Sequence, residues 1–434
     1  MRTLGLCIAL APLALGACLA LPPDEKIPVS SPMPPVVTSH YGEVLSGSIH
    51  WSVDMPAEWN GTLLVFSRGY SQKPDGPQTA PPAYRDQLLQ QGYALAASDY
   101  GSGGWALAEA VPAQEQVIEA FAKRYGKPSR VIGWGNSMGG LVTTALAEKP
   151  RPEIDGGLAV CSSIGGSLGM MNMALDGAFA FKALVVPDKD IKLVRTGDDR
   201  ANGVMVESSV QEAMQTPEGR ARVALAGVLA GIPGWTEGDA PPAGNDIEAQ
   251  VEQIAFAFSR GVFLPRADQE NRAGGVFSWN ENVDYTTLLA RSERQDLVKS
   301  LYAKAGISLV DDLSRLDKAP RIKADKQAIA YMAAHYTPNG RPQVPLLALQ
   351  AVGDGMTSPS LQRAYEEVSN DRMMQSLYTN RAGHCTLDAA EMTAALHRLE
   401  YRISLGVWQS VDTPFIEYTP PPMPRSCFTG KSCQ

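Results

Sequence analysis

Short apolar runs and helical apolar patterns alternate along the first part of the chain. Apolar runs bounded by turn residues, at 62–67, 93–99, 130–134 and 157–162, are typical of buried strands. A further strand is expected over 45–53. Helices are expected over 84–91, over 112–125 with Pro112 in the first turn, and over 138–148. This alternation predicts an α/β fold with a largely parallel sheet.

The alternation stops at residue 166 and returns near residue 344. Residues 166–343 contain mainly helical patterns, such as the apolar face made by Ile247, Val251, Ile254 and Phe258. Strands are then expected over 344–349 and 374–378, with helices over 358–368 and 387–405. We therefore predict one α/β sheet that carries a large helical insertion.

A lone serine stands between glycines at the junction of a strand and a helix. The sequence Gly135-Asn136-Ser137-Met138-Gly139 follows the strand at 130–134 and precedes the helix that starts at Met138. The turn around the serine is so tight that a Cβ two positions before or after it would strike the neighbouring strand or helix. Glycine has no Cβ and therefore permits this turn. Ser137 is therefore predicted to be an exposed nucleophile, and an ordinary glycine-rich turn is the alternative.

A serine hydroxyl needs a base to take its proton. His384 lies in a loop directly after the predicted strand at 374–378, where a base could reach Ser137. The other histidines are His40, His50, His335 and His397. His40 and His50 precede the buried strands of the predicted sheet. His335 lies in the insertion and His397 in the middle of a helix, so His384 is the predicted base.

The base in turn needs an acid to orient it. Asp354 lies between glycines just beyond the apolar run at 344–349. Its alternative role is that of a turn aspartate that binds only its own backbone. Asp99 also ends a strand, but it precedes Ser137, which breaks the order Ser, Asp, His that accompanies this kind of turn.

Composition and charge exclude several other classes of function. The chain is 44% hydrophobic and 19% charged, which is typical of a globular protein with a full core. A net charge of −8 without a basic run argues against a nucleic-acid partner. No spacing of cysteines or histidines matches a metal site, and no phosphate-binding or dinucleotide motif is present, so neither a metal nor a cofactor is expected.

The N-terminus has the pattern of an export signal. A short positive region precedes the apolar run at 4–15, which is too short for a membrane span. Leu15-Gly16-Ala17-Cys18 resembles the bacterial lipobox, which implies cleavage after residue 17, lipidation of Cys18, and an outer-membrane or surface location. A generic signal peptide is the alternative. Residues 18–40 are proline-rich and are expected to form a tether to the lipid, the only membrane contact predicted.

The motifs at Ser137, Asp354 and His384, in that order, resemble those of the α/β-hydrolase superfamily. The resemblance covers residues 41–165 and 344–409, and it implies that 166–343 is a cap inserted between strands 6 and 7 of the sheet. The segment at 64–70 is similar to the superfamily's loop after the third strand. By that match the backbone N–H groups of Tyr70 and Met138 form the oxyanion hole, although Arg68 replaces the usual histidine.

The sheet order of the superfamily also implies a pairing of the cysteines. Export places the chain in an oxidising compartment. The loop that brings His384 to Ser137 carries Cys385 toward Cys161, so a disulfide is expected between these two cysteines. Cys427 and Cys433 would then pair within the tail, 410–434. Free thiols at Cys161 and Cys385, packed as small apolar groups, are the alternative.

The resemblance implies a serine hydrolase that cleaves carboxylic esters. Its alternatives are an exported peptidase acting on short peptides and a non-catalytic binding protein on the same fold. Trp235 and Trp279 in the insertion favour an apolar or aromatic acyl group, unless they form the core of the insertion itself. The sequence does not define the oligomeric state.

Overall fold

The computed structural model describes residues 37–431 and 433, apart from 74–75, 263–264 and 370–371. The predicted signal sequence 1–17, the lipidation site Cys18 and most of the predicted tether lie outside these residues. The eight strands are β1 (Val37–Ser46), β2 (Ile49–Pro56), β3 (Thr62–Ser67), β4 (Ala94–Ser98), β5 (Arg130–Asn136), β6 (Gly156–Val160), β7 (Leu346–Gly353) and β8 (Met374–Ala382). β1 begins inside the segment expected to be a tether.

Fourteen helices accompany these strands in the described part of the chain. They are α1 (Pro82–Gln90), α2 (Leu107–Tyr125), α3 (Met138–Ala147), α4 (Gly166–Leu184), α5 (Asp199–Ala213), α6 (Pro217–Leu229), α7 (Ile247–Gly261), α8 (Ala267–Ala273), α9 (Tyr285–Arg291), α10 (Gln295–Ala305), α11 (Leu309–Lys318), α12 (Lys326–Tyr336), α13 (Pro359–Val368) and α14 (Ala389–Leu405). None of the helices in this part of the chain is long and apolar enough to span a membrane.

The strands form one sheet in the order β1-β2-β4-β3-β5-β6-β7-β8. β1 and β2 are antiparallel to their neighbours, whereas β3 to β8 run parallel. The register places Asn136 opposite Val160 and Val160 opposite Leu349. Loops that follow β5, β6 and β7 therefore leave the sheet at the same edge, where functional groups of parallel sheets gather.

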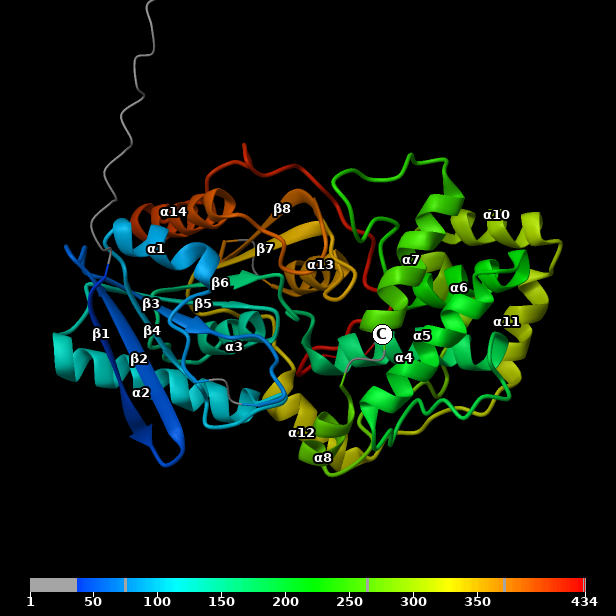
Figure 1. The fold of residues 1–434 in the computed structure, drawn as a ribbon, viewed down its shortest axis with the longest axis horizontal. Helices are drawn as coiled ribbons and strands as arrows, with labels where there is room; N and C mark the ends of the chain where they lie inside the picture. The colour runs from blue at the N-terminus through cyan, green and yellow to red at the C-terminus, as the bar shows by residue number, and fades with distance from the viewer. Residues whose placement is uncertain (1–36, 74–75, 263–264, 370–371, 432, 434) are drawn as a thin grey trace, which may run out of the picture. The chain divides into compact units, whose positions relative to one another are not determined.

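Each face of the sheet buries its apolar side chains under helices (Figure 1). One core joins residues of the sheet to α2, α3 and α13. The other joins the opposite face to α1 and α14, through side chains such as Tyr84, Leu396 and Leu399. β4 and β6 are buried at every position, which explains why their sequences are apolar without alternation.

A mainly helical cap fills the interval between β6 and β7, as expected. No strand occurs between these two in the described residues. α4 ties the cap to the sheet, because Leu168 and Met171 pack in the sheet core while Phe179 and Phe181 pack in a separate core of the cap. In Figure 1 the cap helices lie beyond the carboxyl ends of the parallel strands.

Two expected elements differ from the observed ones. The single strand expected over 45–53 is in fact the end of β1, a turn, and most of β2. Gly47, at φ 56°, permits this tight turn, and the apolar residues on both sides conceal it in the sequence.

The helix expected to start near Pro112 starts at Leu107, so Pro112 is inside α2. Leu107 and Ala110 are buried and extend the apolar face of the helix toward its start. Their burial outweighs the one backbone hydrogen bond that a proline cannot donate.

Candidate active site

Ser137 occupies a sharp turn between β5 and α3. Its φ of 57° and ψ of −120° lie in a region that non-glycine residues rarely adopt. The Ser137 N–H donates to the Val160 carbonyl at 2.9 Å, which fixes the turn against β6. A Cβ added to Gly139 would collide with the backbone of Ser67 and Arg68, and one added to Gly135 with the carbonyl of Gly139. These glycines therefore have the role expected from the sequence.

His384 reaches Ser137 from the loop after β8. Its Nε2 lies 3.0 Å from the Ser137 Oγ, and its Nδ1 lies 2.8 Å from the Asp354 Oδ2. Gly383, at φ 92°, turns the chain back toward the nucleophile just before the histidine. One imidazole thus contacts both partners through its two nitrogens, the geometry that transfer of a proton from a serine requires.

Asp354 is held by its own turn after β7. The carboxylate is fully buried and accepts the N–H groups of Met356 and Thr357, both at 2.9 Å. Burial by itself lowers the pKa of His384, but the charge and hydrogen bond of Asp354 outweigh it and raise that pKa above its usual value. Asp354 therefore binds the backbone of its own turn and the His384 ring at the same time.

Thr357 is a site residue that the sequence analysis missed. Its hydroxyl lies 2.8 Å from the Asp354 Oδ2, 2.9 Å from the Cys161 carbonyl and 3.2 Å from the His384 Nδ1. It therefore links the turn after β7 to the end of β6. The available signal was the spacing Asp-x-x-Thr, since an aspartate often binds the backbone N–H and hydroxyl of a threonine three residues on.

The loop after β3 passes directly beside Ser137. A Cβ added to Gly69 would lie 3.4 Å from the Ser137 Cβ, so the backbone there is in close approach. Arg68, which replaces the superfamily's usual histidine, donates to the carbonyls of Gly69 at 3.0 Å and Ser102 at 2.7 Å. Its guanidinium also lies 4.6 Å from the ring centre of Tyr100. Arg68 thus holds the loop in which Tyr70 lies.

The rival acid and bases have other partners. Asp99 accepts the backbone N–H of His50 and of Gly101, both at 2.9 Å, and contacts the His50 ring at 3.1 Å. His397 lies on α14 and contacts the Gln91 side chain at 3.1 Å, while His335 lies against Tyr331. The structure brings none of these side chains into contact with Ser137.

The structure joins Cys161 to Cys385 and Cys427 to Cys433, the two pairs expected. The Cα atoms of the first pair are 5.3 Å apart, and the Cys385 Sγ lies 3.5 Å from the His384 Nε2. The two sulfurs and a nitrogen of His384 lie within 4.8 Å of one another. Metals bind thiolates, and sulfurs bonded to each other are not thiolates, so this cluster is not a metal site while the disulfide is intact.

The tryptophans of the cap take different places. Trp235 is buried with 6% of its surface exposed, and Trp279 packs partly buried against the sheet core.

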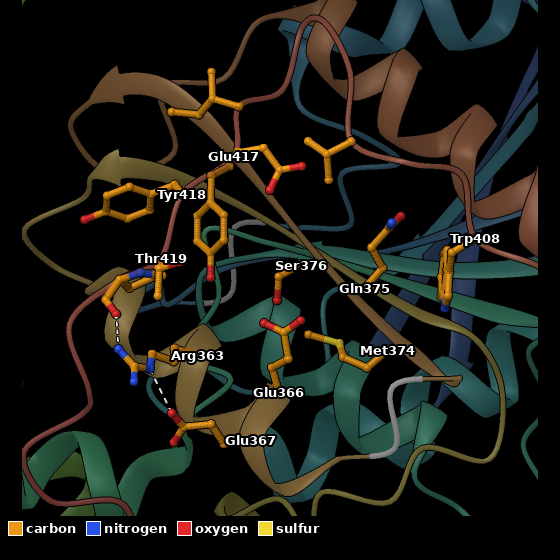
Figure 2. A pocket seen from close by; sticks show the side chains of 14 residues that line it. Arg363, Glu366, Glu367, Met374, Gln375, Ser376, Trp408, Glu417, Tyr418 and Thr419 are labelled. Atoms are coloured by element: carbon orange, nitrogen blue, oxygen red, sulfur yellow. Dashed lines mark hydrogen bonds and ion pairs between the residues drawn. The ribbon is translucent and has the colours of Figure 1, made fainter.

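A cavity of about 560 Å³ lies at the outer edge of β8 (Figure 2). Its lining includes Ser376, Glu366 and Trp408 but no residue of the Ser137–His384–Asp354 group.

The chain is similar to known hydrolases. No family model matches it. It is 29% identical to the o-phthalyl amidase of Xanthobacter agilis over 414 residues, which cover 86% of this chain and 89% of the amidase.

Solved structures include distant matches. Feruloyl esterase B of Aspergillus oryzae is 12% identical, with 87% of this chain and 83% of that chain covered and a TM-score of 0.39. Lipase A of Candida antarctica is 16% identical, with 83% and 75% covered and a TM-score of 0.37.

The order of the strands in the sheet and the turn at Ser137 between a strand and a helix establish the fold. The distant structural matches are not needed for this conclusion. Six parallel strands follow two antiparallel strands, with the turn at Ser137 after β5, Asp354 after β7 and His384 after β8. This is the arrangement expected from the resemblance seen in the sequence. The chain therefore has the α/β-hydrolase fold, with a helical cap between β6 and β7.

Proposed function

We propose that the protein is a serine hydrolase that cleaves carboxylic esters through an acyl-enzyme on Ser137. The observation that carries this proposal is the single imidazole of His384, which contacts Ser137 through Nε2 and Asp354 through Nδ1. A hydrolase role is also supported by the similarity to an amidase over most of both chains.

In the proposed reaction the Ser137 Oγ attacks the carbonyl carbon of the ester. The hydroxyl proton passes to the His384 Nε2 as the O–C bond forms, and the charge of Asp354 stabilises the imidazolium. The backbone N–H groups of Tyr70 and Met138 would donate to the developing oxyanion, where each donor is worth about 3 kcal/mol. Collapse of the intermediate breaks the bond to the alcohol, which leaves with the proton from His384.

A water molecule then completes the reaction in the second half. It gives a proton to the His384 Nε2 and attacks the acyl carbon, and a second tetrahedral intermediate forms. Its collapse breaks the bond to the Ser137 Oγ, which takes the proton back from His384. The products are a carboxylic acid and the free enzyme, and no cofactor enters the reaction.

Hydrolysis of an amide is the second candidate. The name of the similar protein, o-phthalyl amidase, favours an amide of an aromatic acid. The same groups could carry it out, because His384 would protonate the leaving amine in place of the alcohol.

The test uses p-nitrophenyl esters and p-nitroanilides of the same acids, from acetate and butyrate to benzoate and o-phthalate. We expect ester turnover, with Ser137→Ala lowering kcat by at least about a thousandfold. Turnover of the anilides alone would establish the amide candidate instead. Activity retained in Ser137→Ala would contradict the proposal as a whole.

A further inference from the structure

Arg294 is a half-buried cation without an anionic partner. It directly precedes α10, and its Nη1 donates to the Ile232 carbonyl. Its Nη2 is buried and has no hydrogen-bond partner among the described residues. No carboxylate in this part of the chain forms an ion pair with Arg294. An unpaired buried guanidinium nitrogen is costly, so a group that satisfies it would be stabilised there.

The charge of Arg294 persists at neutral pH. Burial lowers the pKa of Arg294 to about 10, which leaves the guanidinium protonated in neutral solution. Tyr418 is the one titratable side chain whose charge acts on it among the described residues, and a tyrosine is neutral at this pH. The site therefore has a net positive charge.

A cavity of about 110 Å³ adjoins this guanidinium, between the cap and the start of α13. Its polar lining includes the hydroxyls of Ser358 and Ser360, whose oxygens are 3.1 Å apart. The Ser358 hydroxyl donates to the Gly231 carbonyl at 2.7 Å. Both serines lie at the N-terminal end of α13, where the helix dipole adds further positive potential.

Apart from Ser292 and two glycines, the remaining wall of the cavity is mainly apolar. It is formed by Tyr418, Val228, Pro233, Pro359, Pro421, Pro422 and Pro424. Tyr418 lies in the C-terminal segment, next to Thr419, and also lines the larger cavity beside β8 (Figure 2). An apolar wall opposite one cation matches a ligand with an anionic head and an apolar body.

We propose that this cavity binds a small organic carboxylate. The carboxylate would accept hydrogen bonds from the Arg294 guanidinium and the Ser360 hydroxyl, and the hydrocarbon part would pack on the proline-rich wall. A cavity of about 150 Å³ in another protein holds benzene, so a short aliphatic acid fits a cavity of this size. The inference does not depend on the hydrolase proposal, because the cavity contains no residue of the Ser137–His384–Asp354 group.

The test is calorimetric titration of the full chain with butyrate, at constant ionic strength. Butyramide and inorganic phosphate serve as the neutral and the inorganic comparison. We expect saturable binding of butyrate, at least tenfold weaker binding in Arg294→Gln, and unchanged binding in Lys299→Gln. The control removes the same charge from an exposed position on α10. Binding of butyrate as a product at Ser137 would survive Arg294→Gln.

Ser360→Val narrows the cavity and removes a hydroxyl from it, but leaves Arg294 unchanged. This variant tests the binding site if Arg294→Gln does not fold. It too should weaken butyrate binding at least tenfold. The proposal would be overturned by absence of saturable binding to the unaltered protein or by equal affinity of that protein for butyrate and butyramide. It would also be overturned if both cavity variants bind butyrate as tightly as the unaltered protein does. Tighter binding of phosphate than of butyrate would overturn the assignment to an organic acid.

Discussion

Ser137 combines a strained backbone with a half-buried hydroxyl. Its positive φ is held by the hydrogen bond to Val160 and by a helix that begins at the next residue. Such strain at one residue costs about 1–3 kcal/mol and persists only when the surrounding structure imposes it. Here the imposed turn places the hydroxyl 3.0 Å from the His384 Nε2.

The contact between Asp354 and His384 gives a testable pH dependence. His384 must be neutral to accept a proton, so kcat/KM should rise with pH through its pKa. Asp354→Asn removes the charge that raises this pKa and leaves the burial that lowers it. We expect the acid limb of kcat/KM to move to lower pH, and kcat to fall by about four orders of magnitude. The pH profile of ester hydrolysis measures both effects.

Asp99→Asn is the matched control for this prediction. Asp99 is also buried, follows a strand and contacts a histidine, but it has no contact with His384. Its replacement should leave the acid limb in place. If Asp99→Asn lowers kcat more than Asp354→Asn does, Asp354 is not the acid of the reaction.

The proximity of Ser137, Asp354 and His384 could be predicted because each residue has a local signal. Ser137 lies between glycines after an apolar run, and Asp354 and His384 each follow a later strand. Arg68 and Thr357 act through contacts with residues distant in the sequence, such as Ser102 and Cys161. Such contacts depend on how loops meet in space. The spacing of Asp354 and Thr357 indicates only their contact with each other.

The loop that carries His384 is fixed to β6 by the disulfide between Cys161 and Cys385. The two cysteines follow β6 and β8, and both have positive φ values. Replacing both by alanine frees the loop, and displacement of a catalytic group by about 1 Å can cost a hundredfold in rate. We expect Cys161→Ala with Cys385→Ala to lower kcat by about tenfold to a hundredfold, measured where circular dichroism shows the folded state.

Replacement of Cys427 and Cys433 by alanine is the control for this experiment. That disulfide joins two residues of the C-terminal segment and leaves the His384 loop untouched. Its loss should leave kcat unchanged. Equal kcat in both double variants would show that the first disulfide does not position the base.

Elements of the parallel sheet were predicted well because buried strands are short, apolar and bounded by turn residues. β3 and β5 match the expected runs, and α13 begins at Pro359 with Ser358 as its N-cap, as expected. The start of α2 and the turn between β1 and β2 were not predicted. At the start of α2 the burial of Leu107 overrides the local signal of Pro112. Between β1 and β2 the apolar residues on both sides conceal the turn at Gly47.

At the scale of the whole molecule, we propose that the chain is exported and anchored by a lipid on Cys18. Cys18→Ser should move the protein from the membrane fraction to the soluble fraction and abolish labelling by a radioactive fatty acid. Hydrolysis should be retained, because the described fold begins at Val37. Cys7→Ser is the control, since Cys7 lies in the expected signal sequence. A wild-type protein that is soluble and lacks Cys18 after processing would contradict this proposal.

The central claim is that Ser137 forms the covalent intermediate. The most direct measurement is labelling with a fluorophosphonate, followed by mass spectrometry of the digested protein. We expect one adduct per chain, on the peptide that contains Ser137, and no labelling of Ser137→Ala. An adduct on another serine, or labelling of Ser137→Ala at the wild-type rate, would contradict it.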